Sequence, residues 1–157
     1  MTVQDVKQKF FAYRNGIVAD ALRKASDRHS IIFGLNLPQL AEIAQMTGKD
    51  ATLARTLWQD GKVRESQLLA PYIMPTEDFV QEEAMEWIKE APNHEVTDLL
   101  CMKLLRNLPY ALELLASLEQ SDSEPTEHIR YTAMRLRKNL EAIGKLPTPT
   151  INDNNLF

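Results

Sequence analysis

The sequence contains a single cysteine and no long apolar run. Cys101 is the only cysteine among 157 residues, so no internal disulfide can form, and such usage is typical of a reducing compartment. No stretch of about 18 apolar residues is present, so the sequence predicts no membrane-spanning helix. The first residues, MTVQDVKQKF, also do not show the basic start and apolar run of a signal peptide. We therefore expect a cytoplasmic protein that does not enter a membrane.

The sequence also lacks the short motifs that mark several enzyme classes. It has no Walker loop, no dinucleotide-binding glycine motif, no HExxH zinc motif and no nucleophile elbow. His94 and His128 could meet Asp98 in space, but three ligands at this separation do not have the spacing of a zinc site. The sequence therefore predicts neither a metal nor a cofactor.

Basic residues do not dominate the chain. The net charge is −4 and the sequence pI is about 5.4, whereas a nucleic-acid-binding protein usually has a basic balance or a basic stripe. The charges are nevertheless unevenly distributed. Acidic residues prevail in 76–95, where Lys89 is the only basic residue, and basic residues prevail in 128–145, where Glu141 is the only acid. The basic segment has two interpretations, a solvated helix face or a face that contacts DNA phosphates.

The sequence has only five glycines but many residues that favour helices. Helical apolar spacing recurs between Pro, Gly and Asn punctuation, and no segment shows the period-two pattern of a strand. The predicted helices are 3–14, 17–24, 38–48, 50–61, 62–75 with a bend or an end around Pro71, 76–90, 94–108, 109–118 and 125–140.

About nine short helices with tight connections predict an all-α, HEAT-like helical-repeat superhelix, in which helix pairs stack on one another. A compact irregular helical bundle is the alternative. We expect one helical-repeat domain over residues 1–144 and a flexible tail over 145–157, because the tail has two prolines and little apolar content. Buried side chains are predicted at Trp58, Trp87, Cys101, Met46, Met74, Met85, Met102 and Met134.

One residue of the predicted helix 94–108 does not fit its surroundings. On a helical wheel Asp98 falls on the apolar side with Leu100 and Leu104, and His94 lies one turn away, within reach of the Asp98 side chain. A carboxylate among apolar groups is costly unless it is paired. Asp98 therefore requires a partner or a function.

Four segments, taken in order, resemble motifs of the DNA alkylation-repair (AlkD-like) family. They are IIFGLNLPQLAEIA (31–44), LWQDGKVRESQLLA (57–70), HEVTDLL (94–100) and HIRYTA (128–133), and the similarity covers about residues 30–140. That family consists of HEAT-like repeat proteins, and its active members are DNA glycosylases that release cationic N3- and N7-alkylated purines. The resemblance implies the same fold and duplex DNA as the partner.

The departures from the family pattern fall at functional positions. In the motif Trp-Asp-x-Val-Asp-Leu, Asp98 matches the second acid and His94 replaces the tryptophan. In the motif Trp-x-Arg-Arg-x-Ala, Arg130 matches the first arginine, Tyr131 replaces the second and His128 replaces the tryptophan. In active relatives the second aspartate lies by the damaged nucleotide, aromatic residues pack against the sugar, and an arginine of the later motif contacts the DNA backbone.

Three interpretations of Asp98 remain open. It is a buried acceptor that His94 helps to neutralise, or a groove-lining carboxylate that stabilises positive charge on a sugar as a cationic base departs. In the third interpretation it is a remnant, and the groove binds something else. Asp98 has a structural role in the first interpretation and a catalytic role in the second.

Two functions are therefore predicted. In the first, implied by the resemblance, the protein binds duplex DNA by phosphate contacts and acts on cationic N3/N7-alkylpurines at a partly retained active site. Asp98 and His94 are its catalytic residues. Its DNA-binding residues are Arg130, Arg137, Arg135, Lys138, Tyr131 and His128. In the second, the chain is a non-catalytic helical-repeat scaffold that binds a protein partner.

Overall fold

The computed structural model describes residues 1–120 and 126–148, and these residues form nine α-helices and no strand. The helices are α1 Val3–Ala12, α2 Gly16–Lys24, α3 Leu37–Thr47, α4 Ala51–Gln59, α5 Arg64–Ile73, α6 Gln81–Glu90, α7 His94–Lys103, α8 Ala111–Glu119 and α9 Glu127–Ala142. Two short 3-10 helices, η1 Thr76–Asp78 and η2 Leu105–Asn107, complete the series. The predicted all-α fold of about nine helices is confirmed.

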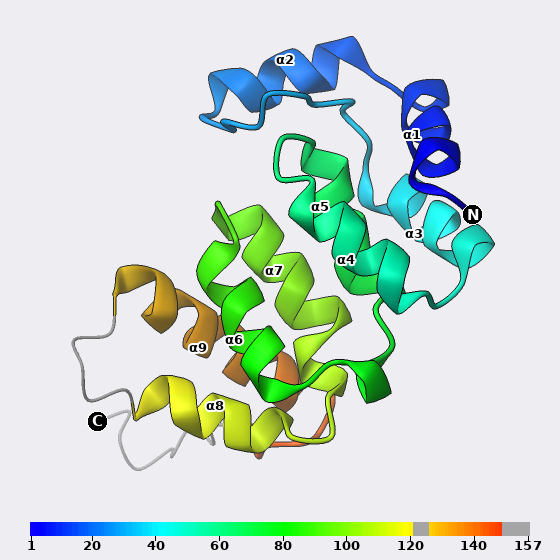
Figure 1. Cartoon of the computed structure of the whole chain (residues 1–157). Helices are drawn as coiled ribbons and strands as arrows, with labels where there is room; N and C mark the ends of the chain where they lie inside the picture. The colour runs from blue at the N-terminus through cyan, green and yellow to red at the C-terminus, as the bar shows by residue number, and fades with distance from the viewer. Residues whose placement is uncertain (121–125, 149–157) are drawn as a thin grey trace.

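Helices α5, α7 and α9 form a continuous layer. Helix α7 packs against α5 on one side and α9 on the other, while α4 packs on α5 and α8 packs on α9 (Figure 1). One cluster of buried apolar residues extends through the layer, from Val6 in α1 to Leu140 in α9. Polar residues at the edges of α7 and α9 are thereby brought side by side, although they are far apart in the sequence.

The core contains the predicted aromatic residues. The rings of Trp58 and Trp87 are stacked, with centroids 4.4 Å apart and planes 1° from parallel, and Phe79 meets Trp87 edge-on. Cys101 is also buried, as predicted. Two of the predicted core methionines are exposed, however, because Met46 lies on the outer face of α3 and Met134 lines a groove between α8 and α9.

Several helix ends differ from the predicted ones. Helix α5 contains Pro71 and ends two residues later, at Ile73, in agreement with the predicted bend or end around Pro71. Other ends differ. Residues 76–78 form η1, and α6 begins only at Gln81. Helix α7 ends at Lys103, where the Leu104 backbone (φ −125°, ψ −61°) leaves the helical region and η2 follows. This break allows both Leu104 and Leu105 to be fully buried.

The two helices that carry the predicted site have side-chain caps at their starts. The Asn93 side chain accepts a hydrogen bond from the Val96 N–H at 2.9 Å, and the Thr126 hydroxyl accepts one from the Ile129 N–H at 3.3 Å. Such caps satisfy backbone donors that have no partner inside the helix. They fix the first turns of α7 and α9, from which His94 and His128 project.

The end of α9 continues into an anchored segment. The Lys145 ammonium donates to the Arg106 carbonyl oxygen at 2.9 Å, and Leu146 packs against the core. Pro125, the predicted start of the last helix, and residues 149–157 of the predicted tail lie outside the described residues. The flexible tail over 145–157 and the single domain over 1–144 stay predictions.

Candidate functional site

Asp98 lies at the margin between α7 and α9. Its side chain is 32% exposed, so it is not sealed in the core. Its Oδ1 accepts a hydrogen bond from the Tyr131 hydroxyl at 2.7 Å and lies 3.0 Å from the Nε of Arg135. Tyr131 and Arg135 are one helical turn apart on α9, and thus face α7 together.

The two contacts to Asp98 differ in kind. The Tyr131 hydroxyl makes a directed hydrogen bond, whereas the Arg135 Nε is close enough for an ion pair but has no hydrogen-bond partner among the residues that the structure describes. Both contacts go to Oδ1. Among the described residues none donates a hydrogen bond to Oδ2, so this oxygen keeps its lone pairs. A carboxylate oxygen of this kind can stabilise a nearby positive charge or orient a water.

His94 completes this cluster by stacking rather than by hydrogen bonding. Its ring lies on the Tyr131 ring, with centroids 3.6 Å apart and planes 7° from parallel. In the described part of the chain no hydrogen bond joins His94 to Asp98. The structure therefore brings together four of the predicted site residues, Asp98, His94, Tyr131 and Arg135, which we call the Asp98 cluster.

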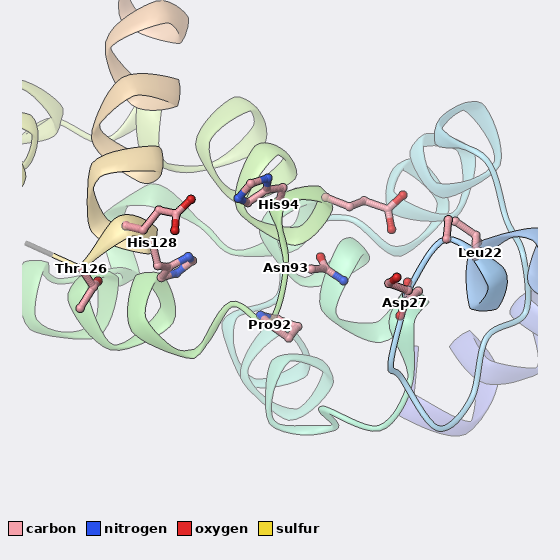
Figure 2. Close-up of a pocket in the computed structure, with 11 residues that line it drawn as sticks. Leu22, Asp27, Pro92, Asn93, His94, Thr126 and His128 are labelled. Carbon is pink, nitrogen blue, oxygen red and sulfur yellow. The ribbon is translucent and has the colours of Figure 1, made fainter.

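A cavity of about 750 Å³ opens beside His94. Figure 2 shows its walls: Leu22 and Asp27 on one side, Pro92 and Asn93 just before α7 with His94 at its first turn, and Thr126 and His128 at the start of α9. The His128 Nε2 lies 2.6 Å from the Ile88 carbonyl oxygen, so this ring ties α9 to α6. His128 therefore borders the cavity but belongs to a different set of contacts from the Asp98 cluster.

The remaining basic residues of α9 lie on another face. Arg130, Arg137 and Lys138 line a groove of about 580 Å³ whose floor includes Leu118 and Met134. The Arg137 guanidinium donates two hydrogen bonds to Glu119, at 2.8 and 2.9 Å. This pairing raises the pKa of Arg137 and lowers that of Glu119. The predicted DNA-binding residues thus divide between two faces of one helix.

A buried ionic network, which sequence reasoning missed, borders the cavity on the other side. Arg64 is 5% exposed and donates two hydrogen bonds to Glu95, at 2.7 and 2.9 Å, and one to Glu65. Burial lowers the pKa of Arg64, but the hydrogen bond to Glu95 and the charges of both acids raise it overall. Glu65 in turn accepts from the backbone N–H groups of residues 33–35.

His29 extends this network into the loop before α3. It is 6% exposed, with Nδ1 2.6 Å from Asp27 Oδ1 and Nε2 2.8 Å from Gln67 Oε1. The residue lies in a loop, but it is buried. Its partner Gln67 is 38 positions away, so no local sequence signal could reveal the contact.

The described helices define a class of protein: an all-α chain of stacked helix pairs, with a polar site on the layer that α5, α7 and α9 form. The family model described as DNA alkylation repair enzyme matches residues 6–135. The chain belongs to the DNA alkylation repair enzyme family, and its fold is accordingly a HEAT-like helical repeat, as predicted. No curated protein and no solved structure matches it significantly. None of the helices in the described residues is long and apolar enough to cross a membrane.

Proposed function

We propose that this protein binds duplex DNA over the layer formed by α5, α7 and α9, and that it excises cationic N3/N7-alkylpurines at the Asp98 cluster. The observation that carries the proposal is the state of the Asp98 carboxylate. It is partly exposed, it is held through Oδ1 by two residues of α9, and no described residue hydrogen-bonds to Oδ2. Family membership makes alkylated DNA the substrate class to test first.

The chemistry needs little acid catalysis. In a cationic alkylpurine nucleotide the bond between the sugar C1′ and the base nitrogen breaks, and its electron pair goes to the base, which leaves neutral. Positive charge then builds on the sugar, and the Asp98 carboxylate stabilises it through Oδ2. Water adds to C1′ and loses a proton, which completes the hydrolysis. The Arg135 guanidinium, beside the carboxylate, is suited to a flanking phosphate.

The decisive experiment measures release of 7-methylguanine from methylated duplex DNA. We expect the wild type to release the base and Asp98→Asn to lose this activity almost completely. The asparagine oxygen still accepts the Tyr131 hydrogen bond, so the substitution removes the charge and leaves the packing intact. Glu86→Gln is a matched control, because it removes one exposed negative charge on α6, which does not contribute to the cluster.

The alternative function is the non-catalytic scaffold. The pairing of Arg137 with Glu119 favours it, because it reduces the basic character of α9, and so does the net charge of −4. A wild-type protein that releases no base at high enzyme concentration, and that does not bind DNA at low salt, would be this scaffold. DNA binding without base release would indicate that the protein binds DNA but has no glycosylase activity.

A further inference from the structure

Tyr131 makes two contacts that together fix its whole side chain. The hydroxyl donates to Asp98 Oδ1 at 2.7 Å, and the ring is stacked on His94 at 3.6 Å and 7°. The hydrogen bond sets the direction of the hydroxyl, and the stack sets the plane of the ring. A side chain held at both ends can act as a rigid support for the residue that it touches.

The phenol supports Asp98 without neutralising it. Burial, followed by the hydrogen bond and the charge of Asp98, raises the pKa of Tyr131 to about 12, so the hydroxyl keeps its proton at neutral pH and remains a donor. A neutral donor fixes a carboxylate oxygen but adds no positive charge. The cation at this carboxylate among the described residues is Arg135, whose Nε is not aligned for a hydrogen bond.

We infer that Tyr131 is the positioning residue of Asp98: its hydroxyl holds Oδ1 and its His94-stacked ring fixes the direction of that hydrogen bond, so that Oδ2 is left to face the reacting sugar. This inference rests on the proposed function for its catalytic consequence. It gives Tyr131 a role on the carboxylate rather than on DNA. The replacement of a motif arginine by tyrosine is then an adjustment of the site and not only a loss.

A spectroscopic test does not depend on catalysis. In protein labelled at the tyrosine Cζ, NMR follows the onset of tyrosine ionisation with rising pH. Asp98→Asn should move the onset for Tyr131 to lower pH, toward the ordinary pKa of 10.0, because the charge that opposes ionisation is gone. Tyr110 is the internal reference, since burial and the charges of Glu82 and Glu83 raise its pKa to about 12, and its onset should not move.

A kinetic test addresses the positioning role. Tyr131→Phe keeps the ring on His94 but removes the hydrogen bond to a charged group, so the excision rate on bound DNA should fall about tenfold or more. The dissociation constant for DNA should change less than about twofold, because the loss of a neutral hydroxyl removes no ionic contact with a phosphate. In the Asp98→Asn background the same change should have no further effect on excision. Tyr110→Phe is the matched control, because Tyr110 donates to the Phe79 carbonyl oxygen far from Asp98.

The outcomes separate the two proposals. If the wild type releases no base, the proposed function fails, and the NMR titration alone decides whether Tyr131 holds the carboxylate. If Tyr131→Phe weakens DNA binding but leaves the rate on bound DNA unchanged, Tyr131 is a DNA contact and the inference is overturned. An onset of Tyr131 ionisation that does not respond to Asp98→Asn overturns it as well.

Discussion

Glu65 shows how a single acid can organise the chain from a fully buried position. It is 0% exposed, at the start of α5, and it pairs with the Arg64 guanidinium. It also accepts hydrogen bonds from the N–H groups of Phe33 and Gly34, at 2.9 and 3.1 Å. A buried carboxylate is tolerated only when such partners replace its water. Glu65 therefore attaches the loop before α3 to α5.

Glu65→Gln is expected to destabilise the protein strongly. The amide keeps the size of the side chain but leaves Arg64 with less negative charge around it and weakens the hydrogen bonds from the loop. We expect the free energy of unfolding to fall by about 3 kcal/mol, measured by urea denaturation. Glu83→Gln is the control, because it breaks the partly exposed pair with Arg55 and should cost at most about 1 kcal/mol. Equal losses in the two variants would contradict the role of Glu65.

At the scale of elements, the start of α2 lies in close backbone contact with the loop before α3. Gly34 has a φ of +87°, and a Cβ there would lie 2.3 Å from the carbonyl oxygen of Asn15. Asn15 is also the N-cap of α2, and its N–H donates to the Phe33 carbonyl oxygen at 2.7 Å. Any side chain at position 34 would therefore push apart the loop and the start of α2.

Gly34→Ala should accordingly destabilise the protein more than Gly48→Ala. Gly48 has a φ of +75°, but no atom of the described residues lies within 4 Å of a Cβ there, so its substitution costs only the backbone strain, about 1–3 kcal/mol. For Gly34→Ala we expect that strain plus the steric clash, with faster hydrogen exchange at the α2 amides. Thermal unfolding gives the difference in stability, and exchange measured by NMR localises it. Similar losses and unchanged α2 exchange would show that the close contact relaxes without cost.

The predicted elements succeed where local chemistry decides and fail where packing decides. A helix was expected over 50–61, and α4 begins there because the Asp50 side chain accepts from the Leu53 N–H. The helix predicted over 94–108 was expected to be continuous, yet α7 ends at Lys103, where a break lets Leu104 and Leu105 both be buried. Capping acts within one turn and is legible in the sequence. The free energy of burial depends on which helices surround a residue, and no local pattern contains that information.

The same limit applies to the site at the scale of the whole molecule. The proximity of His94 and Asp98 follows from their spacing in one helix, and the sequence predicts it. The hydrogen bond from Tyr131 to Asp98 joins residues 33 positions apart, and it depends on how α7 packs against α9. On the helical wheel of α9, Arg130 and Arg137 share one arc, and Tyr131 and Arg135 lie further round. The packing decides that the second pair faces Asp98 and that the first lines the groove beside α8.

The charged residues of α9 allow a test of DNA binding, because the salt dependence of the affinity reports how many cations contact phosphates. Each phosphate contact made by a cation makes the slope of log K against log salt more negative by about 0.9. Arg130→Ala should therefore reduce the steepness of the salt dependence by about 0.9 and weaken binding. Arg137→Ala should have less effect, because Glu119 already neutralises that guanidinium. Fluorescence anisotropy of a labelled duplex, titrated over a series of salt concentrations, measures both.

Glu119→Gln should act in the opposite direction from either arginine variant. It releases Arg137 from its two hydrogen bonds to Glu119, so the freed guanidinium can contact a phosphate. DNA binding should become tighter and its salt dependence steeper by up to about 0.9. Arg137→Ala should abolish this gain when both changes are combined, whereas Arg130→Ala should not. If all these variants bind DNA with the same affinity and the same salt dependence, the basic face of α9 does not contact DNA.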